Sequence, residues 1–210
     1  MHISEGILST PTLVAGVTCA LIGVTIGLKA LKEEKLPLAA LFGALFFMAS
    51  TIHVHVGISS THLILNGLAG LFLGWAVFPV FLISLMLQAF LFSFGGLTVL
   101  GVNLCIMALP AVVVYYLLRG TLKRGITRKK LIAVGLIGGF LGVFLGAIFE
   151  SVVLALDGGK DYINLIGLIF IASIPVFILD SLISVAILLA LLKLKPSFIR
   201  DVFVSGQPNA

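Results

Sequence analysis

Charged residues are scarce in this chain of 210 residues. It contains 13 Lys and Arg and 8 Asp and Glu, ten percent in all, whereas sixty percent of its residues are apolar and the mean hydropathy is +1.28. A water-soluble domain carries roughly 25% charged residues because water must wet its surface. So little charge cannot cover a soluble globule, and the outer surface must therefore face the lipid of a bilayer.

Several motifs of enzymes and redox proteins are also missing. The two cysteines, Cys19 and Cys105, lie inside apolar stretches and form neither a CxxC pair nor a disulfide framework, so they report nothing about redox compartment. No GxxxxGK phosphate-binding run is present, because Leu154 stands where the leading glycine would precede Gly159-Lys160. The chain therefore cannot hydrolyse ATP, and any energy for its function must come from partner subunits.

Long apolar runs are abundant and predict an all-α polytopic membrane protein of about seven spans. With about 20 residues per span, seven spans and short loops fill the chain, so we expect one membrane domain covering 1–210. Within it we expect an N-terminal segment at 1–11, the spans at 12–192 and a C-terminal tail at 193–210. The seven expected spans are 12–28, 37–52, 62–78, 79–92, 97–118, 131–156 and 163–192.

The basic residues test this map independently. In an alternating path of seven spans, 12 of the 13 Lys and Arg residues fall on one side of the membrane. The positive-inside rule makes that side cytoplasmic, which places the N-terminus outside, the C-terminus inside and the protein in the cell's inner (cytoplasmic) membrane. The three basic groups are Lys29, Lys32 and Lys35; Arg119, Lys123, Arg124, Arg128, Lys129 and Lys130; and Lys193, Lys195 and Arg200.

Four histidines, His2, His53, His55 and His62, all fall at the outer end of these spans. His53 and His55 share a face only if their segment is extended. His2 can form fused chelate rings, because the Met1 α-amine, the His2 amide nitrogen and its Nδ1 lie in series. Such a unit is nearly planar and favours metals that accept square-planar nitrogen ligation, Cu²⁺ or Ni²⁺. Segment 1–11 is therefore a candidate metal chelator. We expect 1–9 to be mature sequence, since it lacks the basic residues of a signal peptide.

Two acids and several glycines lie inside the expected spans. Glu150 is near the outer end of its span, where exposure to headgroup water and a functional role are both open, and we expect Asp180 to be protonated or hydrogen-bonded between helices. Neither is expected to bind metal. Small residues four apart, as at Gly23/Gly27 and Gly70/Gly74, favour close helix packing within the chain over docking of a partner.

Three segments together resemble a known family. They are Met1-His2-Ile3-Ser4-Glu5-Gly6; Ser59-Ser60-Thr61-His62-Leu63 followed by Asn66-Gly67-Leu68; and 88–103, which contains Gly95-Gly96-Leu97-Thr98-Val99-Leu100-Gly101-Val102-Asn103. They look like the substrate-capturing membrane subunit (CbiM/NikM) of the cobalt/nickel energy-coupling-factor importers. The resemblance is close over the first half of the chain. Beyond Asn103 it rests on span count and a basic loop.

The resemblance implies a metal site and a set of partners. Met1, His2 and His62 would hold Ni²⁺ or Co²⁺ in a square plane of nitrogens, as transported substrate and without an organic cofactor. His53 and His55, which are additional to the family pattern, and Ser60 and Asn103 are expected to surround the site or form an entry route. Expected partners are a transmembrane coupling subunit, two ATP-binding cassette ATPase subunits, a small accessory membrane subunit and the lipid bilayer, with no nucleic acid. Ile106 departs from the family, which often has a second Asn there.

The same residues argue against other functions. A retinal-type protein needs a Schiff-base Lys in its last span, and 163–192 contains none. An intramembrane metallo-enzyme needs HExxH or several carboxylates, whereas only His53-x-His55 and His62 are present. The serious alternative is a stand-alone permease or channel for divalent metal ions, which would carry polar residues along several spans. Polar ligands gathered at one mouth favour capture over conduction.

Overall fold

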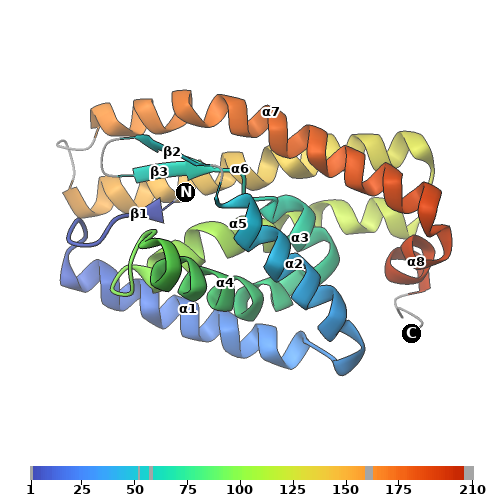
Figure 1. Cartoon of the computed structure of the whole chain (residues 1–210), viewed down its shortest axis with the longest axis horizontal. Helices are drawn as coiled ribbons and strands as arrows, with labels where there is room; N and C mark the ends of the chain where they lie inside the picture. Colours follow the sequence, from blue (N-terminus) through green and yellow to red (C-terminus); the bar gives the residue numbers. More distant parts are fainter. Residues whose placement is uncertain (1, 52, 57–58, 159–162, 206–210) are drawn as a thin grey trace.

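A computed structural model describes residues 2–51, 53–56, 59–158 and 163–205 of the chain. Helices dominate it, and a small sheet lies at one end of the helical bundle (Figure 1). The helices are α1 (Thr10–Ala30), α2 (Leu36–Ala49), α3 (Asn66–Leu73), α4 (Val77–Phe92), α5 (Leu100–Lys123), α6 (Arg128–Gly158), α7 (Ile163–Leu194) and α8 (Pro196–Arg200). The strands are β1 (His2–Ile3), β2 (His53–Val56) and β3 (Ser59–His62).

Five helical stretches are long and apolar enough to cross a membrane, which confirms an all-α polytopic membrane protein. Four of them lie within α1, α5, α6 and α7, and the fifth runs over Asn66–Phe92 and contains both α3 and α4. The remaining helix, α2, has 14 residues, and at 1.5 Å per residue it is shorter than the hydrocarbon core. Helices α1 to α7 correspond in order to the seven expected passages.

The chain reverses direction between α3 and α4, which correspond to the expected spans 62–78 and 79–92. At the start of α3, the Asn66 Nδ2 donates to the Met107 carbonyl of α5 at 3.2 Å. At its end, the Trp75 Nε1 donates to the Tyr116 hydroxyl at 2.9 Å, more than two turns further along α5. Gly74, at φ +58°, starts the short 3-10 turn Gly74–Ala76 that sends the chain back as α4.

The expected span boundaries around the histidines were wrong. The second helix ends at Ala49 rather than at residue 52, and the third begins at Asn66 rather than at His62. Between them lie β2 and β3, because this segment is rich in β-branched residues and pairs with the N-terminus instead of continuing a helix. His62 therefore lies on a strand and does not open a helix.

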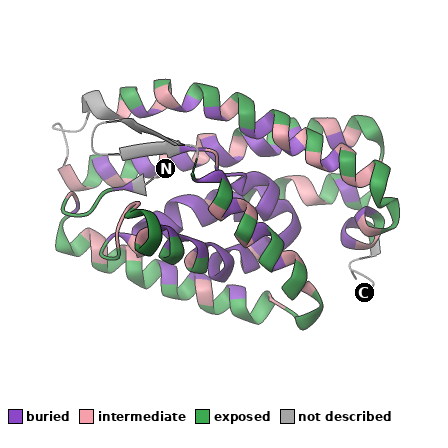
Figure 2. Ribbon diagram, in the orientation of Figure 1, coloured by how far each residue is buried: buried purple, intermediate pink, exposed green. Residues whose placement is uncertain are grey.

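Helix α3 forms the centre of the bundle, and all eight of its residues are buried (Figure 2). Its glycines permit this position: a Cβ at Gly67 would come within 1.9 Å of the Gly138 carbonyl oxygen, and one at Gly70 within 2.0 Å of the Ala111 oxygen. The expectation that the small residues serve internal packing is confirmed at these positions. Helices α1 and α7 lie outside and expose many of their Leu and Ile side chains.

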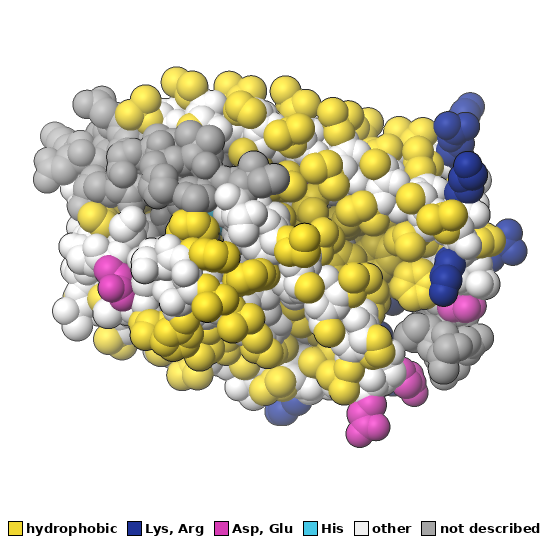
Figure 3. Space-filling view, in the orientation of Figure 1, with side chains coloured by type: hydrophobic (Ala, Val, Ile, Leu, Met, Phe, Trp, Pro, Cys, Tyr) yellow, Lys and Arg dark blue, Asp and Glu magenta, His cyan; other side chains and the backbone are white. Residues whose placement is uncertain are grey.

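The two ends of the bundle differ in character. The sheet and the start of the chain lie at one end, whereas α8 and the C-terminal segment lie at the other (Figure 1). Lys and Arg side chains gather at the α8 end (Figure 3). This placement agrees with the prediction that the basic groups share one side of the membrane. The described part of the expected tail is folded: after α7 ends at Leu194, α8 and Asp201–Ser205 bury Ile199 and Phe203.

Candidate metal-capture site

The sheet brings the two ends of the histidine-bearing region together. Its strand order is β1-β3-β2, with both pairings antiparallel, so the N-terminal strand lies directly beside the strand that ends in His62. The family resemblance placed Met1, His2 and His62 at one metal site, but the sequence predicted no sheet there. Its strands are short and it packs on one end of a helical bundle, so the hydropathy pattern gives it little weight.

The register places all four histidines on one face of the sheet. His2 lies opposite Ser60 across β1 and β3, His55 lies opposite Ser60 across β2 and β3, and His53 lies opposite His62. Directly opposed positions share a face, as do positions two apart on one strand. The expectation that His53 and His55 share a face if their segment is extended is met, because that segment is β2. Met1 and the side chains of His2, His53, His55 and Ser60 lie outside what the structure describes.

His62 is buried, with 1% of its surface exposed. Its Nδ1 lies 2.8 Å from the Leu63 carbonyl oxygen. A carbonyl can only accept, so in the neutral ring this contact assigns the proton to Nδ1 and the lone pair to Nε2. The edge of the ring packs against Phe46 at a centroid distance of 6.3 Å. Metal-binding imidazoles have this arrangement, in which one nitrogen is fixed by a backbone acceptor and the other is the donor.

Asp180 of α7 supports the turn that follows His62. Its two carboxylate oxygens accept hydrogen bonds from the backbone N–H groups of Ile64, at 3.3 Å, and Leu65, at 2.7 Å. Leu65 has a positive φ of 54°, which is uncommon for a non-glycine residue and needs such support. The expectation of a hydrogen-bonded Asp180 is confirmed, with the backbone between β3 and α3 as its partner.

Asn103 at the start of α5 holds the N-terminal strand. The Ile3 N–H donates to its Oδ1 at 2.9 Å, and its Nδ2 donates to the Ile3 carbonyl at 3.0 Å. Both residues are buried. Asn103 was expected near the metal; the structure instead shows it bonded to the residue that follows His2. It therefore fixes where His2 lies.

Glu5 anchors the same segment to the loop between α4 and α5. Its Oε1 accepts the Thr98 N–H at 2.9 Å, and its own N–H donates to the Gly95 carbonyl at 3.1 Å. The Thr98 N–H lowers the pKa of the Glu5 carboxyl below its ordinary value of 4.5, with smaller contributions from the Thr98 hydroxyl and the Leu97 N–H opposing desolvation. A Cβ at Gly96 would lie 2.0 Å from the Glu5 Cγ.

A third anchor lies where the N-terminal segment enters α1. Asp157, at the end of α6, accepts hydrogen bonds from the Ser9 N–H and from the hydroxyls of Ser9 and Thr12. A carboxylate here satisfies a free N–H at the start of a helix and favours the helix dipole. Sequence reasoning missed Glu5 and Asp157 as anchors. Glu5 did carry a signal, because it belongs to the N-terminal motif.

The structure also bears on the expectations for Glu150 and Ile106. Glu150 is fully buried, so the alternative that it meets headgroup water was wrong. Ile106 is buried on α5 and offers no polar group, as its departure from the family suggested. Among the side chains that the structure describes, no three His, Cys, Asp or Glu residues gather in a group.

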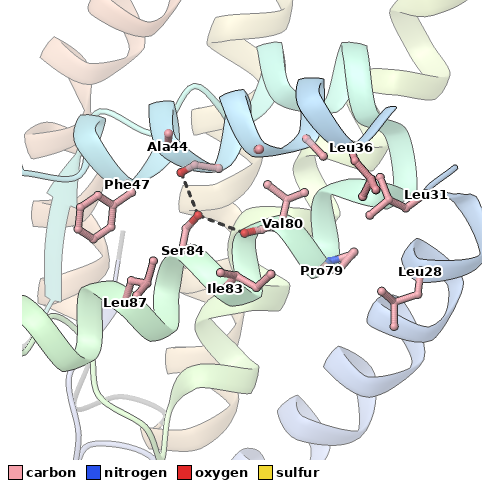
Figure 4. Close-up of a pocket in the computed structure, with 13 residues that line it drawn as sticks. Leu28, Leu31, Leu36, Ala44, Phe47, Pro79, Val80, Ile83, Ser84 and Leu87 are labelled. Atoms are coloured by element: carbon pink, nitrogen blue, oxygen red, sulfur yellow. Dashed lines mark hydrogen bonds between the residues drawn. The ribbon is translucent and has the colours of Figure 1, made fainter. Parts of the chain in front are cut away.

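One cavity of the described chain, which is not lined by any of the histidines, has a volume of about 510 Å³. It opens between α1, α2 and α4 and is lined by apolar side chains such as Leu28, Leu31 and Ile83 (Figure 4). Its polar side chain, Ser84, is bonded to the Gly43 and Val80 carbonyls. This groove suits a hydrocarbon chain and cannot bind a cation.

The fold is shared with solved transition metal transporters. One such crystal structure superposes with a TM-score of 0.76 at 25% identity, covering 92% of this chain and 93% of that one. A truncated transition metal transporter gives a TM-score of 0.77 at 24% identity, covering 92% and 99%. A helical membrane transport protein is therefore the class that this fold defines.

The family model of the cobalt uptake substrate-specific transmembrane region, CbiM, matches residues 2–198, and the chain belongs to this family. It is 57% identical over 196 residues to a protein of Haemophilus influenzae named for metal transport, covering 93% of this chain and 95% of that protein. It is 29% identical to the fused nickel transport protein NikMN of Rhodobacter capsulatus, covering 72% of this chain and 46% of that protein. Members of this family are transporter components and not enzymes.

Proposed function

We propose that this protein captures a divalent transition-metal ion, Ni²⁺ or Co²⁺, at the outer membrane face as the substrate-binding subunit of an energy-coupling-factor importer. The family is named for cobalt uptake, and the fused relative is named for nickel transport. The chain has no nucleotide-binding motif, so ATP hydrolysis falls to partners: two ATP-binding cassette subunits, a transmembrane coupling subunit and a small accessory membrane subunit.

The proposed ligands are four nitrogens. Met1 contributes its α-amine, His2 its backbone amide nitrogen and Nδ1, and His62 its imidazole. The first three close a five-membered and a six-membered ring and lie nearly in one plane, and the fourth completes a square. Square-planar nitrogen ligation suits Ni²⁺. The amide must lose its proton, so binding releases protons and weakens as the pH falls.

One observation carries this proposal: the N-terminal strand pairs with the strand that ends in His62. His2 lies opposite Ser60, and Ser60 and His62 are two apart on β3, so their positions share one face of the sheet. Asn103 on α5, Asp157 on α6 and the Thr98 N–H of the α4–α5 loop, which Glu5 accepts, hold the segment in place. An anchored N-terminus beside a buried histidine supports capture by the terminus itself.

A stand-alone permease is supported less well. Conduction would require polar groups along the spans, whereas the 510 Å³ cavity between α1, α2 and α4 is apolar. The buried Asn66 at the start of α3 is bonded to the backbone of α5 and α6 and serves packing. The four histidines all belong to the strands of the sheet at one end of the bundle, which favours a site that captures its ion and needs a partner to release it.

The proposal is tested by titrating Ni²⁺ into purified protein with an authentic amino terminus and into a variant with one glycine ahead of Met1. The extension leaves each side chain in place but moves the amine. We expect the apo proteins to melt alike and the affinity of the extended protein to fall by more than about 100-fold, since loss of a ligand costs more than the ~10–100-fold of a supporting hydrogen bond. Equal affinities would refute the ligand set. A tag at the C-terminus is the matched control and should change nothing.

A further inference from the structure

Gln88, on α4, is a buried polar side chain to which the contacts described so far assign no role. It has no exposed surface, and within the described chain neither its Oε1 nor its Nε2 has a hydrogen-bond partner. The other buried carboxamides nearby are satisfied: Asn66 bonds backbone groups of three helices, and Asn103 bonds Ile3. An orphaned buried amide requires an explanation, and an absent ligand is one.

The position of Gln88 relates it to the N-terminal strand. Its carbonyl accepts the Phe94 N–H at the end of α4, so it lies about one turn inside the loop that joins α4 to α5. Asn103 lies about one turn inside the other end of that loop, on the neighbouring helix α5. The loop itself holds Glu5. Gln88 and Asn103 thus occupy comparable depths on adjacent helices, and Asn103 at that depth bonds the residue after His2.

Aromatic contacts connect the same face of α4 to His62. Phe81 precedes Gln88 by two turns on one stripe of the helix. Its ring stacks on Phe46 at 4.0 Å, and Phe46 packs against the His62 ring. Gln88 thus lies on the helix that is linked to His62 through Phe81 and Phe46, about one turn from the loop that holds Glu5.

We propose that Gln88 is a positioning residue of the metal-loaded site: its Oε1 accepts a hydrogen bond from an N–H that the bound nitrogen ligands retain. An amine or imidazole bound to a divalent ion becomes a stronger N–H donor, because the metal withdraws electron density from the nitrogen. In the apo protein the Gln88 carboxamide lacks that donor. This inference rests on the proposed function. It adds a contact that requires one of the metal-bound nitrogen atoms to carry a hydrogen.

The test compares Ni²⁺ affinity with apo stability in Gln88→Met. Met is similar in length and unbranched, so packing changes little, while both unsatisfied polar atoms disappear. We expect the Ni²⁺ affinity to fall ~10–100-fold, as for loss of a hydrogen bond to a metal ligand. The apo melting temperature should stay equal or rise, because removing an unpartnered buried amide relieves a desolvation penalty. A residue that merely packs would not give these opposite changes.

Two further variants complete the experiment. Gln88→Glu retains an acceptor oxygen and should restore binding to within a few-fold of wild type, with the Ni²⁺ d–d band back at its wild-type position. Ser84→Ala, one turn below on the same face, removes hydroxyl bonds to Gly43 and Val80 (Figure 4) and should leave the affinity unchanged. If wild type binds Ni²⁺ and Gln88→Met binds it equally tightly, this inference alone fails. If wild type binds none, the proposed function fails as well.

Discussion

Asn103 holds Ile3 by both of its backbone groups: the Ile3 N–H reaches Oδ1 at 2.9 Å, and Nδ2 reaches the Ile3 carbonyl at 3.0 Å. The side-chain amide replaces a neighbouring strand at the free edge of β1, whose other edge pairs with β3. Two sequence motifs that lie about 100 residues apart are thus one structural unit. The second motif holds the first in register with His62.

Replacing Asn103 should separate binding from folding. In Asn103→Leu the Ile3 N–H and carbonyl stay buried without partners, which costs about 1–3 kcal/mol for each group. We expect both a lower melting temperature and an affinity for Ni²⁺ reduced by ~10–100-fold, because His2 is no longer held. Calorimetric titration and thermal unfolding measure the two effects.

The matched control is Ile106→Ala on the same helix. Ile106 is buried and touches no ligand segment through hydrogen bonds, so it should lose about 2–5 kcal/mol of stability with its affinity intact. If the two variants lose affinity in proportion to their loss of stability, Asn103 has no particular role in placing His2.

Removing a hydrogen-bond acceptor from Asp180, which supports the turn after His62, should also weaken Ni²⁺ binding. Asp180→Asn keeps the shape but retains one acceptor oxygen for two N–H groups, those of Ile64 and Leu65. We expect a loss of about 1–3 kcal/mol in unfolding free energy, and weaker Ni²⁺ binding as the turn after His62 relaxes. Ser173→Ala, also buried on α7 but bonded within its own helix, should leave binding unaltered. Unchanged affinity in Asp180→Asn would show that this turn does not position His62.

Substitutions of different histidines should affect Ni²⁺ binding to different extents. His62→Ala should abolish a yellow, d–d absorbing Ni²⁺ complex, because it removes the proposed fourth nitrogen. His53→Ala should have a smaller effect: β2 is separated from the N-terminal strand by β3, so His53 lies one strand further away. Absorption spectra recorded during titration distinguish the two variants. Equal losses would mean that the wrong histidine was chosen as the ligand.

The orientation in the membrane follows from the basic residues. Single cysteines placed at Thr127 and at Gly158, in a protein from which Cys19 and Cys105 have been removed, lie at opposite ends of α6. The positive-inside rule predicts that a membrane-impermeant thiol reagent applied to intact cells labels Gly158→Cys and leaves Thr127→Cys unlabelled. The reverse pattern would place the histidine sheet in the cytoplasm and overturn capture from outside.

Much of this architecture follows from composition alone. Lipid is the only solvent that such an apolar surface tolerates, so the membrane class and the approximate helices could be predicted from local hydropathy. The gathering of Lys and Arg at one end also follows, because each span moves the chain across the bilayer. The candidate ligands were named from chain connectivity at the terminus and from a family resemblance, both of which are visible in sequence.

Only the tertiary structure decided how the candidate site is built. A sheet of strands as short as β1, with two residues, has no hydropathy signature, and it exists because Asn103, β3 and the helices beneath satisfy its backbone. The same reason made His62 the end of a strand and α3 a short buried helix. The role of Asp180 depends on which backbone groups lie opposite it across a distant segment, and no local pattern records that. Local hydropathy thus determined the membrane fold, whereas long-range hydrogen bonding in the absence of water decided the site.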